Sequence, residues 1–272
     1  MAFQFCSFAS GSSGNCYMVK SDETVLLIDV GISGKKIIEG LTSQNLSVEQ
    51  VKGILITHEH TDHVKSLKMM SKKASAARIY SSAGTLAQIM DKVEGDRARA
   101  IGASERFAVG DISVTAFRLS HDAAEPVGFS LTHEGRQVTI VTDTGCISEE
   151  MFRHMVKADL LVLEANHEVN ILKMGSYPYH LKRRILGEEG HLSNETAGEC
   201  LCRILKMRQC QSHGETSELP SVLLAHLSRE NNTPSQAYLT IRNILFEEDF
   251  YIDKDLKLEV APRDEIGSCM EV

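Results

Sequence analysis

The chain has 272 residues, of which 42% are hydrophobic and 24% charged, and its formal net charge is −8. A chain of this length and composition can bury a large core without disulfide or metal staples. The acidic balance and the lack of a long basic block exclude a protein that wraps nucleic acid over an extended surface. They do not exclude a metal centre that handles a single phosphate.

The first residues and the cysteines predict a cytoplasmic protein. Residues 1–10 lack the basic and apolar regions of a signal peptide, and no stretch is apolar enough to span a bilayer. The seven cysteines show no disulfide-framework spacing. Cys200 and Cys202 would point to different faces of a helix, so we expect buried, reduced thiols rather than a zinc knuckle.

Strand and helix patterns alternate along the chain. Strands are predicted at residues 17–20, 25–29, 53–57, 78–80, 112–119, 127–133, 137–142, 160–163 and 221–225, with a closing β segment at 250–260. Helices are predicted at 64–73, 85–93, 194–207 and 234–246, and Ser148 can cap another that ends near Val156. Glu134-Gly135 suits a hairpin turn. The pattern predicts one α/β domain over residues 1–272, with two sheets and outer helices.

A cluster of metal-binding side chains follows the strand at 53–57. His58, His60, Asp62 and His63 lie within six residues, and imidazole and carboxylate together favour zinc, manganese or iron over magnesium or calcium. In an extended loop His58 and His60 project to one side, whereas Asp62 and His63 fall where a helix begins. This arrangement suits two ions that activate a water and hold the leaving oxygen.

Further strands each deliver a histidine or an aspartate at their carboxyl ends. These residues are Asp29, His121, Asp143 and His226. A single histidine at a strand end is usually structural, but sites of α/β proteins assemble at this edge of a sheet, and the recurrence favours a site. Seven candidate ligands, with Asp29 set aside, are too many for one tetrahedral ion, so we expect two divalent ions.

The H-x-H-x-D-H motif with later His, Asp and His residues resembles the metallo-β-lactamase superfamily. Three further segments, residues 8–15 (FASGSSGN), 190–194 (GHLSN) and 225–232 (AHLSRENN), resemble the YycJ/WalJ group within it. The resemblance extends from about residue 3 to 263, which is nearly the whole chain.

The resemblance implies a four-layer αβ/βα sandwich with a dinuclear site at its upper edge. By it, one ion is held by His58, His60 and His121, and the other by Asp62, His63 and His226. Asp143 would bridge the ions, Asp62 would also take part in catalysis, and Asp29 would orient the histidine loop. Dedicated β-lactamases usually lack this form of the Asp-His pair, so antibiotic hydrolysis is not expected. The chain has no room for the inserted domain of the larger nucleases, which argues against processing of long RNA.

His191 and His226 compete for the last ligand position. His226 directly follows an apolar strand, as the other ligands do, whereas His191 precedes a helix. In the related tRNA 3′-processing and cyclic-phosphodiester enzymes, a histidine in the context of His191 is the general acid, oriented by a glutamate in a Glu-Ala pair. Glu164-Ala165 matches that pair, and phosphodiester cleavage needs such an acid. The alternatives are a helix-entry role for His191 and a structural role for Glu164.

Substrate contacts are predicted from weaker signals. Ser12, Ser13 and Asn15 lie in a glycine-rich segment that either supplies N–H groups to a phosphate or forms a tight turn. Arg229 is predicted to contact a nucleic-acid backbone, and the basic run 182–184 either makes such contacts or forms a solvated helix face. Five other histidines have no ligand context and are predicted not to bind metal: His133, His154, His167, His180 and His213.

Three functions are compatible with these residues. The first is a phosphodiesterase, most specifically a DNA exonuclease that acts on DNA ends, as the family resemblance implies. The second is a small-molecule hydrolase of a cyclic phosphodiester, thioester or lactone, which the acidic charge and modest size favour. The third is a non-catalytic metal-binding module, which would not need an acid such as His191. We expect no membrane partner, and the sequence identifies no protein partner.

Overall fold

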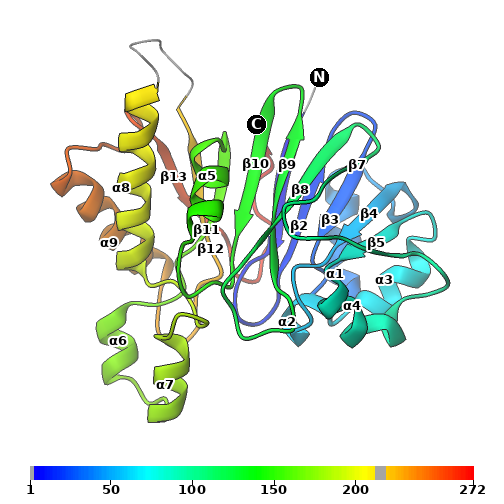
Figure 1. Cartoon of the computed structure of the whole chain (residues 1–272), viewed down its shortest axis with the longest axis horizontal. Helices are drawn as coiled ribbons and strands as arrows, with labels where there is room; N and C mark the ends of the chain where they lie inside the picture. The colour runs from blue at the N-terminus through cyan, green and yellow to red at the C-terminus, as the bar shows by residue number, and fades with distance from the viewer. Residues whose placement is uncertain (1–2, 212–218) are drawn as a thin grey trace. The chain divides into compact units, whose positions relative to one another are not determined.

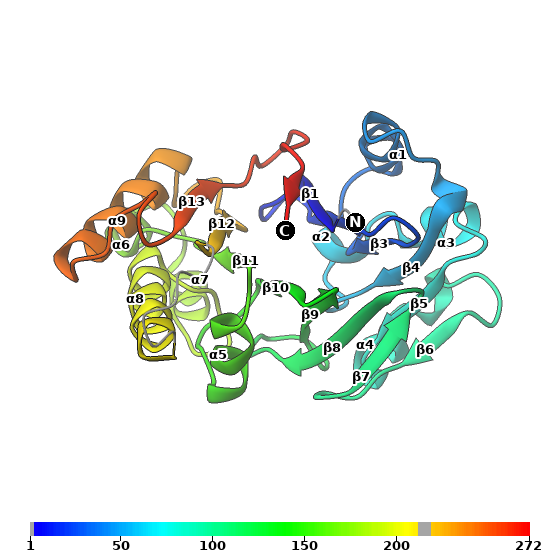
Figure 2. The same ribbon diagram turned by 90° about the horizontal axis from the view of Figure 1, so that it is seen from above.

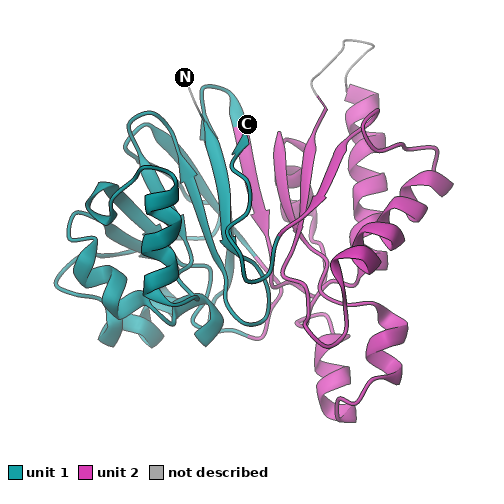
Figure 3. Cartoon of the chain, turned by 180° about the vertical axis from the view of Figure 1, so that it is seen from behind, with its two compact units in different colours: residues 1–118, 123–136, 262–272 teal, residues 119–122, 137–261 magenta. Residues whose placement is uncertain are grey.

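A computed structural model describes residues 3–211 and 219–272. The chain divides into two compact units (Figure 3). Unit 1 consists of Met1–Arg118, Ala123–Arg136 and Pro262–Val272, and unit 2 of Leu119–Asp122 and Gln137–Ala261. Within the described stretches, no helix has the length and apolar character needed to cross a membrane.

Unit 1 contains a mixed sheet with the strand order β14-β1-β2-β3-β4-β5-β6 (Figure 1). The pairs from β14 to β3 are antiparallel, and those from β3 to β6 are parallel. The strands are β1 (Gln4–Ala9), β2 (Cys16–Lys20), β3 (Val25–Ile28), β4 (Val51–Leu55), β5 (Arg78–Ser81), β6 (Ala98–Ala100) and β14 (Met270–Glu271). The parallel half therefore brings the ends of β3 and β4 to the same edge.

Helices pack on one face of this sheet. They are α1 (Gly34–Ser43), α2 (Thr61–Val64), α3 (Leu67–Lys73) and α4 (Ala83–Ile89), with 3₁₀ turns at Val48–Gln50 and Met90–Lys92. Their apolar stripes, such as Ile37 and Leu41 of α1, join the buried side chains of β1 to β5 in one core cluster. Gly40 permits close packing, because a Cβ there would lie 2.7 Å from the ring of Phe8. Burying such a ring contributes about 1.5–3 kcal/mol.

Three antiparallel strands complete unit 1: β7 (Arg106–Val109), β8 (Ile112–Arg118) and β9 (Val127–His133). Tyr80 of β5 stacks on Phe107 of β7 with ring centroids 5.0 Å apart. The first sheet is therefore buried on both faces, which explains the nearly continuous apolar runs in β3 and β4.

Unit 2 is built on parallel strands in the order β10 (Arg136–Val141, in unit 2 from Gln137), β11 (Leu160–Glu164), β12 (Ser221–Ala225) and β13 (Lys257–Val260). Figure 2 shows α5 (Glu149–Val156), α8 (Asn194–Gln211) and α9 (Pro234–Glu247) along one side of these strands. Two short helices, α6 (Val169–Met174) and α7 (Tyr179–Ile185), form a pair that projects from unit 2 (Figure 1).

The predicted elements agree with the structure in most places. The bounds of β9 and β12 are as predicted, Ser148 caps α5 by accepting from the Met151 N–H, and Glu134 and Gly135 form the predicted turn with φ values of 47° and 83°. The predicted helix 64–73 is wrong as a single element, because the chain breaks between α2 and α3. The predicted β segment 250–260 is too long, because only Lys257–Val260 is a strand.

Candidate active site

The histidine loop connects β4 to α2 in unit 1. The rings of His58 and His60 lie 4.6 Å apart, those of His58 and His63 lie 4.0 Å apart, and Nε2 of His63 is 3.6 Å from Oδ2 of Asp62. His58 and His63 are buried, whereas the Asp62 side chain is 28% exposed. The four candidate ligands of this loop therefore lie together, and His60 and Asp62 are the two that are partly exposed.

Asp29 holds the loop from the end of β3. Its Oδ1 accepts from the Thr57 N–H at 2.9 Å, and its Oδ2 accepts from the Thr57 hydroxyl and from Nδ1 of His63, both at 2.8 Å. The Thr57 hydroxyl also lies 3.0 Å from Nδ1 of His58. Thr57 is a positioning residue that the sequence reasoning missed, although it opens the motif. Asp29 makes the contact expected of a carboxylate that orients a metal-binding histidine.

Asn15 supports the same loop from inside the protein. Its N–H donates to the Asp62 carbonyl at 2.8 Å, and its carbonyl accepts from the Gly31 N–H at 2.8 Å. Its side-chain oxygen accepts from the Gly11 N–H at 3.0 Å, so its amide nitrogen faces Nε2 of His63 at 3.1 Å. Asn15 is fully buried. The prediction that Asn15 contacts the substrate is therefore wrong. Ser12 and Ser13, the other two residues of this segment predicted to contact the substrate, are exposed.

Glycine is required at position 31, where the backbone after β3 passes close to the histidine loop. A Cβ at this position would lie 1.6 Å from the carbonyl oxygen of Asp62, so a side chain must displace the peptide between Asp62 and His63.

We expect Gly31→Ala to weaken metal binding by about 10–100-fold, as loss of a supporting contact typically does. Calorimetric titration of metal-free protein with zinc or manganese measures this. Gly102→Ala is the matched control, since its Cβ would meet only Glu105 Oε2 at 3.8 Å. Equal affinities in the two variants would contradict the assignment.

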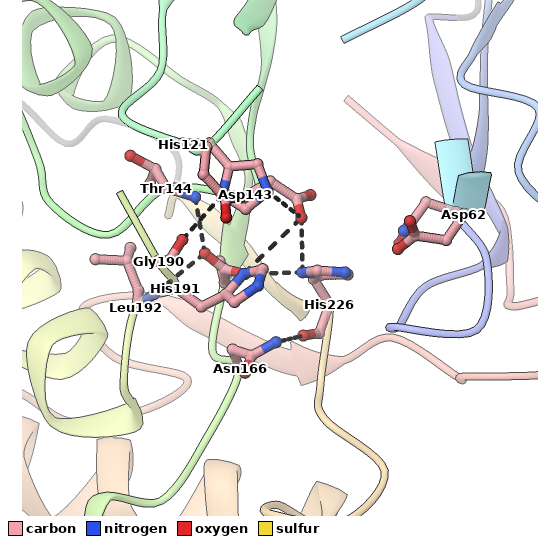
Figure 4. A network of polar contacts seen from close by, with 12 residues as sticks. Asp62, His121, Asp143, Thr144, Asn166, Gly190, His191, Leu192 and His226 are labelled. Carbon is pink, nitrogen blue, oxygen red and sulfur yellow. Dashed lines mark hydrogen bonds and ion pairs between the residues drawn. The ribbon is translucent and has the colours of Figure 1, made fainter. Parts of the chain in front are cut away.

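Glu164 is at the centre of a polar network in unit 2. Figure 4 shows four other members of the network, His121, Asp143, His191 and His226. Oε1 of Glu164 accepts from Nδ1 of His191 and from Nδ1 of His226, both at 2.8 Å. Its Oε2 accepts from the N–H groups of Thr144 at 3.0 Å and Leu192 at 3.1 Å. Burial alone would raise the pKa of Glu164, but the charges and hydrogen bonds of His191 and His226 outweigh it and hold that pKa well below its usual value.

Asp143 and His121 complete this network. Oδ1 of Asp143 lies 3.4 Å from Nδ1 of His226 and 3.9 Å from both Nε2 of His121 and Nδ1 of His191. Nδ1 of His121 contacts the Gly190 carbonyl at 3.1 Å. Burial lowers the pKa of His121, although Asp143 opposes this effect, so its neutral, metal-binding form is favoured. Unit 2 therefore brings together four of the residues predicted for the site: His121, Asp143, His191 and His226.

The histidine tautomers suit metal binding at His121 and His226. In His63, His121 and His226, Nδ1 faces a carboxylate or carbonyl oxygen that can only accept. The proton therefore resides on Nδ1, and Nε2 carries the lone pair. In His121 and His226 this lone pair suits a metal, whereas in His63 it faces the Asn15 amide nitrogen at 3.1 Å. A histidine whose Nδ1–H is held by an acceptor is the common arrangement at zinc, manganese and iron sites. The donor set therefore fits divalent ions of this kind.

The motif segments around His191 and His226 are fixed by the residues that follow β11. Asn166 donates through its side chain to the His226 carbonyl at 2.9 Å, and its backbone N–H donates to the Leu192 carbonyl at 2.9 Å. The Asn194 N–H donates to the His167 carbonyl at 2.9 Å. His167 is buried, and His213 lies outside the described residues. These contacts tie the segments of His191 and His226 to the residues that follow β11.

The basic residues predicted to contact substrate differ in their surroundings. Lys182 donates to the carbonyls of Lys173 and Gly175, and Arg184 pairs with Asp122. Arg183 and Arg229 are exposed. Among the described residues, Arg183 makes no hydrogen bond or ion pair, so it is better placed than its two neighbours to bind a phosphate.

Known proteins resemble this chain over most or all of its length. The family profile described as "Beta-lactamase superfamily domain" matches residues 24–213. Exodeoxyribonuclease YycJ of Bacillus anthracis is 34% identical over 261 residues, 95% of each chain. Exodeoxyribonuclease WalJ of Streptococcus pneumoniae is 34% identical over 277 aligned positions, 100% of this chain and 99% of that protein.

Solved structures match over the whole chain. The metallo-beta-lactamase fold protein YhfI of Bacillus subtilis superposes with a TM-score of 0.72 at 16% identity, covering 99% of each chain. Zinc-bound PqqB of Methylobacterium extorquens superposes with a TM-score of 0.69 at 16% identity, covering 99% of this chain and 100% of the other. At these identities the likeness establishes the fold.

Proposed function

The chain belongs to the beta-lactamase superfamily and has its α/β sandwich fold, and from this premise we propose that it is a metal-dependent exodeoxyribonuclease. The observation that carries the proposal is the pair formed by Glu164 and His191. The His191 side chain is 16% exposed, whereas His121 and His226 are nearly fully buried, so of these three histidines His191 is the one that a substrate can reach. Full-length likeness to two exodeoxyribonucleases supports the choice of DNA.

We assign the metal ligands by the family motif. His58, His60 and His121 would hold one divalent ion, Asp62, His63 and His226 the other, and Asp143 would bridge them. The contacts made by Asp29 and Glu164 within their own units support this assignment, since each orients a ligand histidine. When bound, zinc, manganese or iron would supply Lewis acidity to the phosphodiester and to a water molecule.

The protein's own groups would move the protons. His191 donates from Nε2 to the departing oxygen, while its Nδ1–H stays hydrogen-bonded to Glu164, which orients the ring. Asp62, the more exposed of the two ligand aspartates, is suited to accept a proton from the attacking water. Ser12, Ser13 and Arg229 are exposed and would contact the DNA.

The domain organisation and the cellular location are proposed from less specific observations. The family match covers parts of both units, which supports one hydrolase domain over the whole chain. All seven cysteines lie among the described residues as free thiols, which favours the cytoplasm.

A substrate panel tests the proposed activity. Purified protein with zinc, manganese or iron is given end-labelled DNA and RNA, bis-p-nitrophenyl phosphate, a thioester and a lactone. We expect stepwise shortening of DNA ends. The net charge of −8 favours a small-molecule hydrolase as the second candidate. Turnover of only the small esters, with every polynucleotide end intact, would replace the nuclease by that candidate.

The two late histidines are expected to behave differently. His191→Ala should keep its metal content and lose turnover by about 10²–10⁴-fold, since a general acid is removed. His226→Ala should lose metal, because its Nε2 is the proposed ligand. Elemental analysis and turnover are measured on the same samples. Metal loss in His191→Ala with retention in His226→Ala would show that the roles are reversed.

A further inference from the structure

One segment of unit 2 has a charge opposite to that of the chain. Residues 169–187, which we call the arm, comprise α6, α7 and the turn between them. The arm contains Lys173, Lys182, Arg183 and Arg184 and no acidic residue, in a chain whose net charge is −8. A local basic patch on an acidic protein is the electrostatic footprint of a polyanion that binds at one place.

The tip of the arm exposes large apolar side chains. Met174 ends α6 and is 87% exposed, and Tyr179 begins α7 and is 77% exposed. Both lie beside the turn that joins the helices, and Arg183 is exposed one helical turn after Tyr179. An exposed aromatic ring beside an uncommitted cation is the combination that binds single-stranded nucleic acid, by stacking on a base and pairing with a phosphate.

The base of the arm is joined to the proposed acid. The His191 N–H donates to the Ile185 carbonyl at 3.0 Å, and the Gly190 N–H donates to the Gly187 carbonyl at 2.9 Å. Arg184 pairs with Asp122, which directly follows His121. From Ile185 back to Tyr179, α7 extends roughly 9 Å at 1.5 Å per residue. The arm therefore begins at the segment that holds His191 and carries Tyr179 roughly 9 Å along α7 from it.

We propose that the arm binds single-stranded DNA beside the bond that is cleaved, since its base holds the proposed acid His191. Tyr179 stacks on a base, and Arg183 and Lys173 pair with phosphates. Stacking accepts any base, so the arm provides length preference without sequence preference. The proposal rests on the proposed nuclease function, and it adds a binding subsite outside the metal centre.

Binding is measured without catalysis. Fluorescence anisotropy follows labelled oligothymidylate on the full chain in the presence of a chelator. Tyr179→Ala is expected to weaken binding by about 5–100-fold, the equivalent of one stacked base, and Tyr179→Phe to retain wild-type affinity. Arg183→Ala should weaken binding most at low salt. Phe246→Ala is the matched control, since that ring is 62% exposed on α9, outside the arm. Unchanged affinity in Tyr179→Ala and Arg183→Ala would overturn the proposal.

Catalysis separates this proposal from the nuclease function. Tyr179→Ala should raise the KM for a long oligothymidylate while its kcat changes little, and should remove the preference of the wild type for the long chain over a dinucleotide. A fall in kcat on bis-p-nitrophenyl phosphate as well would mean that the arm only supports the fold, which contradicts the proposal. If the wild type binds DNA through Tyr179 but shortens no DNA end, the proposed nuclease function is wrong, whereas the proposed DNA binding by the arm is retained. Arm-dependent binding of RNA but not DNA would overturn the assignment of the ligand.

Discussion

Glu164→Ala is expected to lower turnover by about 10²–10⁴-fold and to lower the free energy of unfolding by at least about 3 kcal/mol. The carboxylate accepts hydrogen bonds from two imidazoles and two backbone N–H groups, and all four donors would lose their acceptor in a buried place. Each unsatisfied donor costs about 1–3 kcal/mol. Denaturant unfolding and single-turnover kinetics measure the two effects on one preparation.

Glu168→Gln is the control for this prediction. Glu168 is also buried and accepts from Asn194 and Thr240, but it contacts neither His191 nor His226. We expect the Glu168→Gln variant to have a lower free energy of unfolding than the wild type and an unchanged turnover. Full turnover in Glu164→Ala, or an equal loss of turnover in Glu168→Gln, would contradict the role given to Glu164.

The stability that Glu164 contributes should depend on pH. Its pKa is depressed in the folded protein, so folding favours the ionised form, and the contribution is complete above the unfolded value of 4.5. As the pH falls below 4.5 toward the folded pKa, the contribution is lost. The difference in unfolding free energy between wild type and Glu164→Ala should therefore be constant from neutral pH to about 4.5 and shrink below it.

His60→Ala and Asp143→Ala are each expected to lose bound metal and turnover together, by more than about 100-fold, since removing a ligand exceeds the loss of a supporting contact. The wild type should carry two ions per chain, because its ligand candidates exceed one tetrahedral site. Elemental analysis alongside DNA hydrolysis provides the measurement. His154→Gln is the control, since His154 lies on α5 and has no ligand context. Full activity in either ligand variant, or a single ion in the wild type, would refute the dinuclear assignment.

Elements with a strong local signal could be predicted from the sequence. β12 is an apolar run between turn signals, and α5 has a serine cap before an amphipathic stripe. α1 escaped prediction because it begins with glycine and two lysines, and its buried stripe of Ile37 and Leu41 is short. α6 and α7 are too short to be stable alone, and their pairing depends on Lys182, which donates to two carbonyls at the end of α6. The segment before β13 turns instead, since Asp255 accepts from the Tyr251 N–H.

The candidate site was predicted as a set of residues but not as a network. Their positions at strand ends identify Asp29, Asp143 and His226 as candidates. All three residues adopt positive φ values, between 55° and 61°, and the sequence pattern does not predict this backbone conformation. The contact of Asn15 with the loop of Asp62 joins positions far apart in the sequence, so its local context suggested a phosphate cradle instead. The double role of Glu164 depends on three strands meeting at one edge, which only the folded chain reveals.

The two ends of the arm are held together where it leaves and rejoins the strand layer. The Asn166 N–H bonds to the Leu192 carbonyl and the Asn194 N–H to the His167 carbonyl, so the chain departs and returns at one closed point. Insertions and deletions are tolerated where the flanking backbone is closed in this way, because the cost of loop closure rises only slowly with length. The part of the arm before Ile185 can therefore be exchanged, whereas Ile185 must stay, because its carbonyl accepts from the His191 N–H. A lineage, or an engineer, can lengthen, shorten or replace that part and so change which polymers the enzyme accepts, while Glu164 and the hydrolytic groups around it stay as they are.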